Sequence, residues 1–536
     1  MTDAALLLRG GVVYSPADPF ATAMVVADGR VAWVGSEGAA DATAGPGLRT
    51  VDLRGGLVTP AFVDAHVHLT DTGLALSGLD LTATVSAHDV LERVSAAVRA
   101  RPGQPVLGHG WDDTVWSTSP PSREEIDRAA EGAPVYLSRV DVHSALLSTA
   151  MLERVPGIAA MDGFDSSGPL SRQAHHRVRR ASRDSLTAAE RQGLQHTALR
   201  AAAAAGIGQV HEMAAPHIAG AEDLTLLRAW TADRQDVPEV VSYWGELNGV
   251  DTARELGARG CAGDLCIDGS VGSRTAAMSR PYAGGAGRGA QYVSLDEATA
   301  HVVACTRAGM QAGFHCIGDA AVATAVDALR AAAERCGQGE VMACRHRLEH
   351  VEMVDAEQAR VMAALGVVAS VQPAFDASWG GSDGMYARSV GASRAETMNP
   401  FAMLARTGVT LAFGSDSPVT PFDPWGSVRA AAEHRTPDHR LTARAAFAAH
   451  TRGGWRAAGL DGAGVLVPGA PASYAVWDVD ADLVVQAPDG RVAAWSTDPR
   501  AGVPGLPDMR ASAPVPTCRQ TTVRGRVVHD ADTPGS

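Results

Sequence analysis

The chain has 536 residues, of which 46% are hydrophobic and 20% are charged, and its formal net charge at pH 7 is −14. That length allows two or three domains, because a single hydrophobic core rarely grows beyond about 250–300 residues. An acidic chain without a basic run is a poor partner for nucleic acid or for an anionic membrane, so neither is expected.

The N-terminal segment, MTDAALLLRGGVVYS, has a short apolar run with no positive charge before it, which makes a poor signal peptide. Apolar segments stay below the roughly 18 residues that suggest a transmembrane helix. The seven cysteines are scattered without CxxC spacing, which is typical of reduced, buried thiols. We expect a cytoplasmic protein with a small-molecule substrate and no membrane partner. The assembly considered is a homodimer.

Short β-rich runs broken by glycine turns occur at both ends of the chain. Those near the N-terminus lie at 6–14, 24–35 and 48–58, and the same texture returns after about residue 464. Neither set is large enough to bury a core alone, so the simplest arrangement pairs them. We therefore predict one discontinuous β-sandwich domain, composed of residues 1–58 and 465–536.

Between these ends, short apolar strands alternate with helical patterns that carry apolar residues at i, i+3 and i+4 spacing. The strand candidates lie at 57–66, 207–212, 238–244, 264–268, 310–315, 345–350, 367–371 and 410–415. This alternation predicts a (β/α)8 TIM barrel over 59–464. A doubly wound open sheet is the alternative, but no glycine-rich phosphate loop follows the first strand.

The first and second strand candidates are separated by about 130 residues, and a connection of that length needs its own structure. It contains the helix-like AHDVLERVSAAVRA, the segment GHGWDDTVWSTSPPSREEID and the strand-like APVYLSRVDVH. We predict that residues 71–200 form an insertion domain over the mouth of the barrel.

Histidines and one aspartate stand at the C-terminal ends of predicted strands. His66 and His68 are two residues apart on an extended strand, so both rings leave the same face. His315, His350 and Asp416 end three later strands. In a barrel these ends form the catalytic face, where the side chains can converge. A single pair of histidines is a weak signal, but the five residues together predict a metal site.

The composition of this set also indicates the metal. Imidazole and carboxylate ligands without thiolates suit Zn²⁺, with Fe²⁺, Mn²⁺ or Co²⁺ as alternatives. Such a set leaves a coordination position for water, as catalytic sites do, and a metal lowers the pKa of that water toward neutrality. Asp416 can both contact the metal and accept the proton, so it is the predicted general base and proton shuttle.

Several longer segments carry a resemblance that extends over essentially the whole chain. They are GLVTPAFVDAHVHL, GHGWDD, DVHSALLSTAML, DGSVGSRTA, HCIGDAAV, RLEHVE and GSDSPV. With the β-rich ends, they resemble the amidohydrolase superfamily and, within it, the YtcJ-like branch (amidohydrolase family 3) that includes N-substituted formamide deformylase. The resemblance implies a barrel beside a β-sandwich. It also implies one or two divalent metals surrounded by His66, His68, His315, His350 and Asp416.

The chemistry implied by the resemblance is attack of metal-activated water on a C–N bond of an amide, a formamide, a cyclic amide or an aminated ring. A metal or His350 would polarise the carbonyl, and Asp416 would pass the proton to the leaving nitrogen. The leading hypothesis is a hydrolase of non-peptide C–N bonds in an N-acyl or N-formyl amine. A single-metal deaminase of an aminated heterocycle is the alternative. A catalytically silent scaffold is the third, and the complete His and Asp set argues against it.

Asp264 departs from this resemblance. Many relatives carry a lysine four residues before the aspartate of the DGS motif, here Asp268, and in binuclear relatives a carbamylated lysine bridges the metals. This chain has no lysine, so all 46 of its Lys and Arg residues are arginine and that bridge cannot form. Because aspartate is several atoms shorter, we expect its carboxylate to fall short of a metal held by His66 and His68.

Three alternatives for the metal site follow. A single-metal site, with Asp264 supporting the ligands from outside, is the favoured one. A two-metal site bridged by Asp264 or by water is the second, and a site of impaired or altered activity is the third. Asp268 and Asp319 are also expected to support the ligands, with Asp319 orienting a metal-binding histidine.

Other residues are candidates for contact with the substrate. Trp111 and Asp112, together with Trp116, could line an apolar or aromatic pocket, or could instead anchor the core of the insertion. His143 is a second candidate. Arg274 could hold a carboxylate or a carbonyl, with an ion pair to a neighbouring acid as the alternative.

His211 and Glu212 end the second predicted strand on the same face as the metal-binding candidates. For these two residues a structural contact is as well supported as a functional one.

Overall fold

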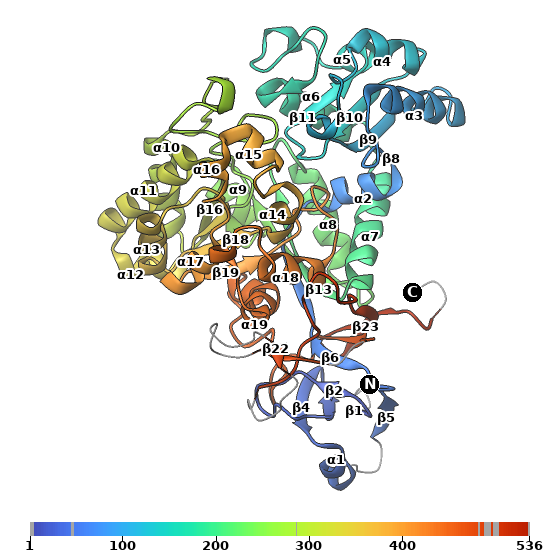
Figure 1. The fold of residues 1–536 in the computed structure, drawn as a ribbon, viewed down its shortest axis with the longest axis vertical. Coiled ribbons are helices and arrows are strands. Elements are labelled where there is room, and N and C mark those ends of the chain that lie inside the picture. Colours follow the sequence, from blue (N-terminus) through green and yellow to red (C-terminus); the bar gives the residue numbers. More distant parts are fainter. Residues whose placement is uncertain are drawn as a thin grey trace.

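The computed structural model describes residues 5–43, 48–285, 287–480, 483–486, 495–496 and 503–533. An eight-stranded parallel barrel forms its centre (Figure 1). The strands are β7 (Phe62–Val67), β13 (Ile207–Ala214), β14 (Glu239–Trp244), β15 (Gly260–Cys261), β16 (Gln311–Cys316), β17 (Arg347–His350), β18 (Val368–Val371) and β19 (Thr410–Phe413). They follow one another around the sheet in chain order, and a parallel bridge between Val67 and Ser417 closes it. The predicted (β/α)8 barrel is confirmed.

Helices surround this barrel. They are α2 (Leu69–Ser77), α7 (Ala188–Ala204), α8 (Ala221–Thr231), α9 (Val250–Glu255), α10 (Leu295–Arg307), α11 (Asp319–Cys336), α12 (Gln338–Cys344), α13 (Ala356–Ala364), α14 (Pro373–Trp379), α15 (Met385–Val390), α16 (Ala392–Ala395), α17 (Phe401–Thr407), α18 (Pro424–Ala432), α19 (Ala443–Ala448) and α20 (Gly454–Ala457). Several begin at capping boxes, such as Ser294 with Glu297 before α10. Every residue of β13 is buried, as expected for a parallel strand covered on both faces.

The fourth strand differs from the sequence prediction, which placed it at 264–268. β15 ends earlier, and the chain then bulges before it pairs with β16 again. Cys261 pairs with Ala312 and Cys266 pairs with His315, so five residue steps on one segment oppose three steps on the other. A local bulge of this kind cannot be read from hydrophobic alternation, because the extra residues break the period of two.

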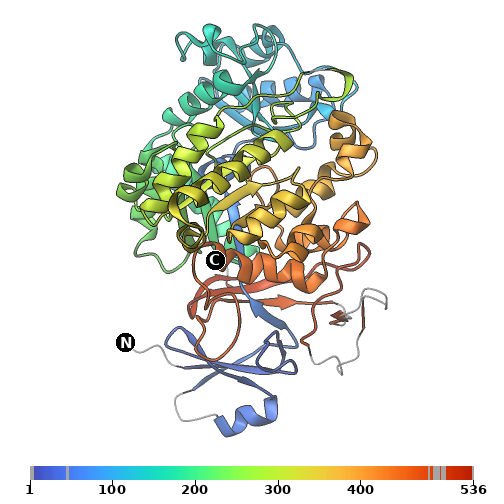
Figure 2. The same ribbon diagram turned by 90° about the vertical axis from the view of Figure 1, so that its left-hand side faces the viewer.

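A β-sandwich lies at one end of the molecule, where blue N-terminal and red C-terminal strands run side by side (Figures 1 and 2). One sheet contains β1 (Leu6–Arg9), β3 (Ala23–Ala27), β4 (Arg30–Gly35) and β5 (Arg49–Asp52), with α1 (Glu37–Thr43) beside it. The other contains β2 (Val12–Val13), β6 (Leu57–Pro60), β20 (Tyr474–Asp478), β23 (Thr517–Val523) and β24 (Arg526–Asp530). A two-stranded sheet consists of β21 (Val485–Gln486) and β22 (Trp495–Ser496).

The pairing of β6 with β20 joins the two ends of the chain in one sheet. Apolar side chains from both sheets, including Met24, Val58 and Tyr474, form a shared buried core. The separate β domain built from both termini is therefore confirmed, while the boundaries at 58/59 and 464/465 stay predictions.

The long connection after the first barrel strand folds into a five-stranded sheet with its own helices, drawn above the barrel in Figure 1. Its elements are β8 (Leu79–Asp80), α3 (Ala87–Ala100), β9 (Val106–Trp111), α4 (Arg123–Ala130), β10 (Val135–Arg139), β11 (Ser144–Leu147), α5 (Thr149–Leu152), β12 (Leu170–Ser171) and α6 (Arg172–Asp184). A buried ion pair fixes it to the barrel, since Asp71 of α2 binds Arg179 and Arg183 of α6. Throughout the described ranges, no helix is long and apolar enough to span a membrane.

Candidate metal centre

The five predicted ligands converge at the C-terminal end of the barrel, and all five are buried. The Oδ1 atom of Asp416 lies 3.5 Å from His66 Nε2 and 3.3 Å from His68 Nε2. The ring of His350 has its centroid 5.0 Å from that of His66 and 4.5 Å from that of His315. Strands far apart in the sequence therefore bring four imidazoles and a carboxylate together.

Asp264 joins this group, which corrects the expectation that its short side chain would fall short. Its Oδ1 atom lies 3.3 Å from His66 Nε2, and its Oδ2 atom lies 3.2 Å from His68 Nε2. The His350 Nε2 atom is 4.0 Å from Oδ1. The carboxylate thus touches the same ring nitrogens as Asp416 does.

The bulge after β15 explains this reach. Gly263 adopts a φ of +87°, a conformation that favours glycine, and a Cβ there would lie 2.7 Å from Met213 Sδ. The Leu265 amide donates back to the Gly263 carbonyl at 2.8 Å, which tightens the turn. Asp264 lies within this bulge of two extra residues and not on an unbroken strand, so the length of its side chain alone does not set its reach.

The orientation of His66 is fixed by a buried carboxylate that the sequence analysis missed. Glu349 Oε2 lies 2.9 Å from His66 Nδ1, which directs Nε2 toward Asp264 and Asp416. Arg347 donates to both oxygens of Glu349, at 2.5 and 3.0 Å. Burial raises the pKa of Glu349, but Arg347 outweighs it and lowers that pKa to about 2. The available signal was the pattern Arg-x-Glu on an apolar barrel strand, where each charge needs a partner.

We predict that Glu349→Gln will weaken metal binding by about 10–100-fold, the usual effect of losing a carboxylate behind a ligand histidine. A competition titration with a metal-sensitive dye would measure the affinity. Glu357→Gln, an exposed change on α13, is the matched control and should leave the affinity unchanged. Equal affinities for the two variants would contradict the role of Glu349.

Two of the other three histidines, His315 and His350, also have a polar side chain behind the ring. Gln372 Oε1 lies 2.8 Å from His350 Nδ1. Asp268 Oδ1 lies 3.5 Å from His315 Nδ1, and the same carboxylate accepts backbone hydrogen bonds, among them one from Gly318 at 2.8 Å. Asp268 therefore lies where it was expected, behind a candidate ligand.

Asp319 does not contact a histidine of the centre in the described structure. Its carboxylate accepts a hydrogen bond from the Ser279 amide at 2.8 Å and one from the Ser279 hydroxyl. It therefore closes the loop after the bulged strand, and Asp268 holds the histidine that Asp319 was expected to orient.

His211 and Glu212 make structural contacts. His211 Nε2 lies 3.2 Å from Gln209 Oε1, and its Nδ1 lies 3.2 Å from Arg347 Nη1. Glu212 accepts a hydrogen bond from the Leu69 amide at 2.8 Å and so holds the start of α2.

A further residue that the sequence analysis missed is Asp64, two residues before His66. Its Oδ1 atom accepts hydrogen bonds from the His66 amide at 3.2 Å and from the Ser415 amide at 2.9 Å. One buried carboxylate therefore ties together the two segments that carry His66 and Asp416.

The charges of the centre suit a divalent cation. Burial lowers the pKa of His66, but Asp264 and Asp416 outweigh it and hold that pKa well above its ordinary value. Against the same burial, these carboxylates raise the pKa of His68 to about 9. Burial raises the pKa of Asp264, yet His66 and His68 lower it well below its usual range.

Two histidine protons thus balance two carboxylates at neutral pH, and a divalent cation would replace those protons. Several buried atoms facing the centre lack a hydrogen-bond partner within the described ranges: His66 Nε2, Asp264 Oδ1 and Asp416 Oδ1. These residues therefore fit a bound metal.

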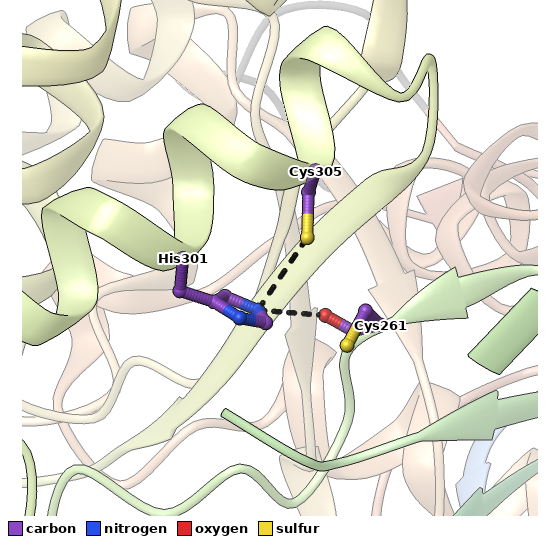
Figure 3. A group of neighbouring side chains, drawn as sticks. All are labelled: Cys261, His301 and Cys305. Carbon is purple, nitrogen blue, oxygen red and sulfur yellow. Dashed lines mark hydrogen bonds between the residues drawn. The ribbon is translucent and has the colours of Figure 1, made fainter. Parts of the chain in front are cut away.

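A second group of potential ligands lies outside the barrel, between β15 and α10 (Figure 3). His301 Nε2 lies 3.0 Å from the Cys261 carbonyl oxygen, and His301 Nδ1 accepts a hydrogen bond from the Asn248 amide at 2.9 Å. Cys305 Sγ is 3.7 Å from His301 Nε2. Because both ring nitrogens bind backbone groups, this group suits a hydrogen-bonded core that anchors β15 better than a metal site.

A cavity opens onto the metal centre between the barrel and the insertion. Asp112 and His143 of the insertion line it, and the His143 ring centroid is 5.2 Å from that of His315. His143 therefore lies beside the centre, and Asp112 lies in the wall of the same cavity. Asp112 also forms an ion pair with Arg139 at 2.6 Å.

Trp111 and Arg274 lie elsewhere. Trp111 is 1% exposed, its Nε1 donates to the Leu137 carbonyl at 2.9 Å, and its ring lies 6.1 Å from that of Trp116. This is the anchoring position considered as the alternative. Arg274 is exposed and, with Trp111, lines a neighbouring cavity. Neither side chain lines the cavity that contains the metal centre.

Comparison with known proteins gives consistent matches. A family model described as "Amidohydrolase family" matches residues 49–529. The protein LONG AFTER FAR-RED 3 of Arabidopsis thaliana is 27% identical over 88% of both chains. N-substituted formamide deformylase of Arthrobacter pascens is 25% identical over 80% of this chain and 85% of its own. The crystal structure of an uncharacterized metal-dependent hydrolase from Pyrococcus furiosus has a TM-score of 0.70 at 27% identity, over 89% of this chain and 99% of that one.

Proposed function

The chain belongs to the amidohydrolase family, and from that premise we propose that it hydrolyses a non-peptide C–N bond in an N-acyl or N-formyl amine. The observation that carries the proposal is the convergence of four histidines and two carboxylates at one end of the barrel. The similarity to a formamide deformylase supports the choice of bond.

We propose Zn²⁺ as the metal, held by His66, His68 and Asp416 with help from Asp264 and His350. Histidine nitrogens and carboxylate oxygens without thiolates support this choice. When bound, such a metal would polarise the carbonyl and lower the pKa of the attacking water.

Asp416 moves the proton in this proposal. It lines the cavity, its Oδ1 atom is buried, and its amide donates to the His66 carbonyl at 2.8 Å. As water adds to the carbonyl carbon, Asp416 accepts its proton; as the C–N bond breaks, Asp416 returns that proton to the departing nitrogen. The products are a carboxylic acid and an amine.

His350 is a candidate metal ligand beside Asp416 in this proposal. Gln372 holds its Nδ1 atom, and its ring is stacked on Phe375 at a centroid distance of 6.0 Å. A neutral ring that donates from Nδ1 to Gln372 leaves Nε2 as an acceptor directed at the centre, where it can bind the metal.

Metal removal tests the proposal. Chelation is expected to abolish turnover of a panel of formamides and acyl amides, and Zn²⁺ or Mn²⁺ should restore it, because without a cation the carbonyl is not polarised. Metal content by mass spectrometry and release of acid plus amine would be followed together. Release of ammonia would support the deaminase instead, and full activity of the metal-free protein would refute metal dependence. Absence of turnover with every metal would favour the scaffold.

A cytoplasmic location and a homodimer stay predictions. The seven cysteines are free thiols, which supports a reducing compartment. Cell fractionation and analytical ultracentrifugation would test the two predictions.

A further inference from the structure

One acidic side chain in the cavity has no part in the hydrolysis described above. Glu352 lines the cavity two residues after His350, and it is 2% exposed. In the described part of the chain its Oε2 atom makes no well-formed hydrogen bond, and the polar side chain that interacts with Glu352 is Tyr386, which lines the same cavity. A buried carboxylate of this kind is costly unless a donor binds it.

The arginine in the cavity wall does not donate a hydrogen bond to Glu352. Arg139 is the one arginine among the lining residues, and it is bound to the carboxylates of Asp112 at 2.6 Å, Asp113 at 3.0 Å and Asp141 at 2.9 Å. Asp141 also accepts hydrogen bonds from serine hydroxyls, one of them Ser270 at 2.7 Å. The insertion side of the cavity is therefore already paired, which leaves Glu352 as the carboxylate free to bind a ligand.

Aromatic rings line the same cavity as Glu352. Phe375 and Trp379 have centroids 5.0 Å apart, Trp379 lies 6.4 Å from Tyr386, and all three line the cavity. Aromatic faces beside a carboxylate favour a cation, since both present negative potential to the ligand. They also accept an alkyl chain, which lets one wall bind both parts of an alkylamine.

We propose that Glu352 is a specificity-determining residue that binds an ammonium group or another N–H donor on the amine portion of the substrate, beside Phe375, Trp379 and Tyr386. The inference rests on the proposed hydrolysis of an N-acyl or N-formyl amine and narrows its substrate class to derivatives of diamines or similar cations. A substrate carboxylate is excluded, because it would meet Glu352 and would find Arg139 already bound.

Three formamides of matched length test the proposal with metal-loaded protein: mono-N-formyl cadaverine, N-formylhexylamine and N-formyl-aminohexanoate. They end in an ammonium, a methyl and a carboxylate group. For the natural chain, kcat/KM should be at least about tenfold higher for the ammonium than for the methyl compound, and lowest for the carboxylate. Equal values for the ammonium and methyl compounds would overturn the proposal.

Glu352→Gln keeps the size of the side chain and removes its charge. The preference for the ammonium compound should fall to about twofold or less, through KM rather than kcat, whereas Glu357→Gln on exposed α13 should keep it. An unchanged preference in Glu352→Gln would overturn the proposal. An equal loss of kcat/KM for all three substrates would also overturn the proposal, because a residue with a purely structural role would lower all three values by the same factor.

Binding separates this inference from the proposed function. If none of the three formamides is hydrolysed, the proposed function fails. The role of Glu352 is then tested by measuring the binding of hexylammonium by calorimetry. Tighter binding to the natural chain than to Glu352→Gln, by about tenfold, would support it. Equal binding to both proteins would overturn it.

Discussion

Asp416→Asn is expected to lower kcat by about 10²–10⁴-fold, the usual contribution of a positioned acid or base. Asparagine has the shape of aspartate but cannot take the proton of the attacking water, and it cannot return one to the leaving nitrogen. Few other carboxylates at the site could replace Asp416 as the base. Asp264 contacts both His66 and His68, and Glu349 and Asp268 are committed to histidines behind the centre.

Metal content decides how the result is interpreted. If Asp416→Asn binds metal normally and turns over slowly, the lost function is proton transfer; if it also loses metal, Asp416 is needed as a ligand. Asp438→Asn, an exposed change outside the lining of the cavity, is the control and should behave as the natural chain. A near-normal kcat in fully metal-loaded Asp416→Asn would refute the assigned role.

The barrel and most of its metal-centre residues could be predicted because they follow strict local rules. Parallel strands buried on both faces are short apolar runs, and a barrel collects functional side chains at the ends of those runs. His66 and His68 are recognisable from a spacing of two on one strand, and His350 and Asp416 from their positions at strand ends. Each of these signals lies within a few residues of sequence.

The supporting residues could not be predicted because their partners are far away in the chain. Glu349 contacts His66 across 283 positions, and Asp64 contacts Ser415 across 351 positions. Gln372 belongs to the strand that follows His350 and has no feature of its own that marks it. Only the closed barrel brings these pairs into contact, so no local pattern contains the information.

The position of Asp264 was mispredicted for a different reason. Counting atoms in the side chain was correct, but the backbone was assumed to follow an unbroken strand. The bulge at Gly263 adds residues before Cys266 pairs with His315, and so it displaces the backbone that carries Asp264. Register shifts of this kind depend on packing between strands, here against Met213.

The His66 ring favours a single-metal site. Two groups of potential ligands share the His66 ring. One group adds His68 and Asp416, and the other adds Asp264 and His350. Glu349 occupies its Nδ1 atom, so Nε2 is the one nitrogen left and it can bind a single ion. We therefore expect one tightly bound metal per chain, with Asp264 in contact with it. Two equivalents at full activity would contradict this expectation.

Asp264→Ala is accordingly expected to weaken metal binding by at least about 10–100-fold, because it removes a carboxylate that contacts both His66 and His68. Asp264→Asn should do nearly the same, since it keeps the shape and loses the charge. Asp319→Asn is the matched control, because Asp319 contacts Ser279 rather than a histidine of the centre. Full metal affinity in Asp264→Asn would refute direct contact.

The pH dependence of metal binding gives a readout that does not depend on catalysis. With Asp264 present, carboxylate contacts overcome burial and raise the pKa of His68 to about 9, so metal must displace a proton at any lower pH. Affinity in the natural chain should therefore rise with pH up to about 9. In Asp264→Ala the His68 pKa should fall, so the rise should end at lower pH and fewer protons should be released at pH 7. Calorimetry in buffers of different ionisation enthalpy would count those protons, and an unchanged count would show that Asp264 does not set the charge of the centre.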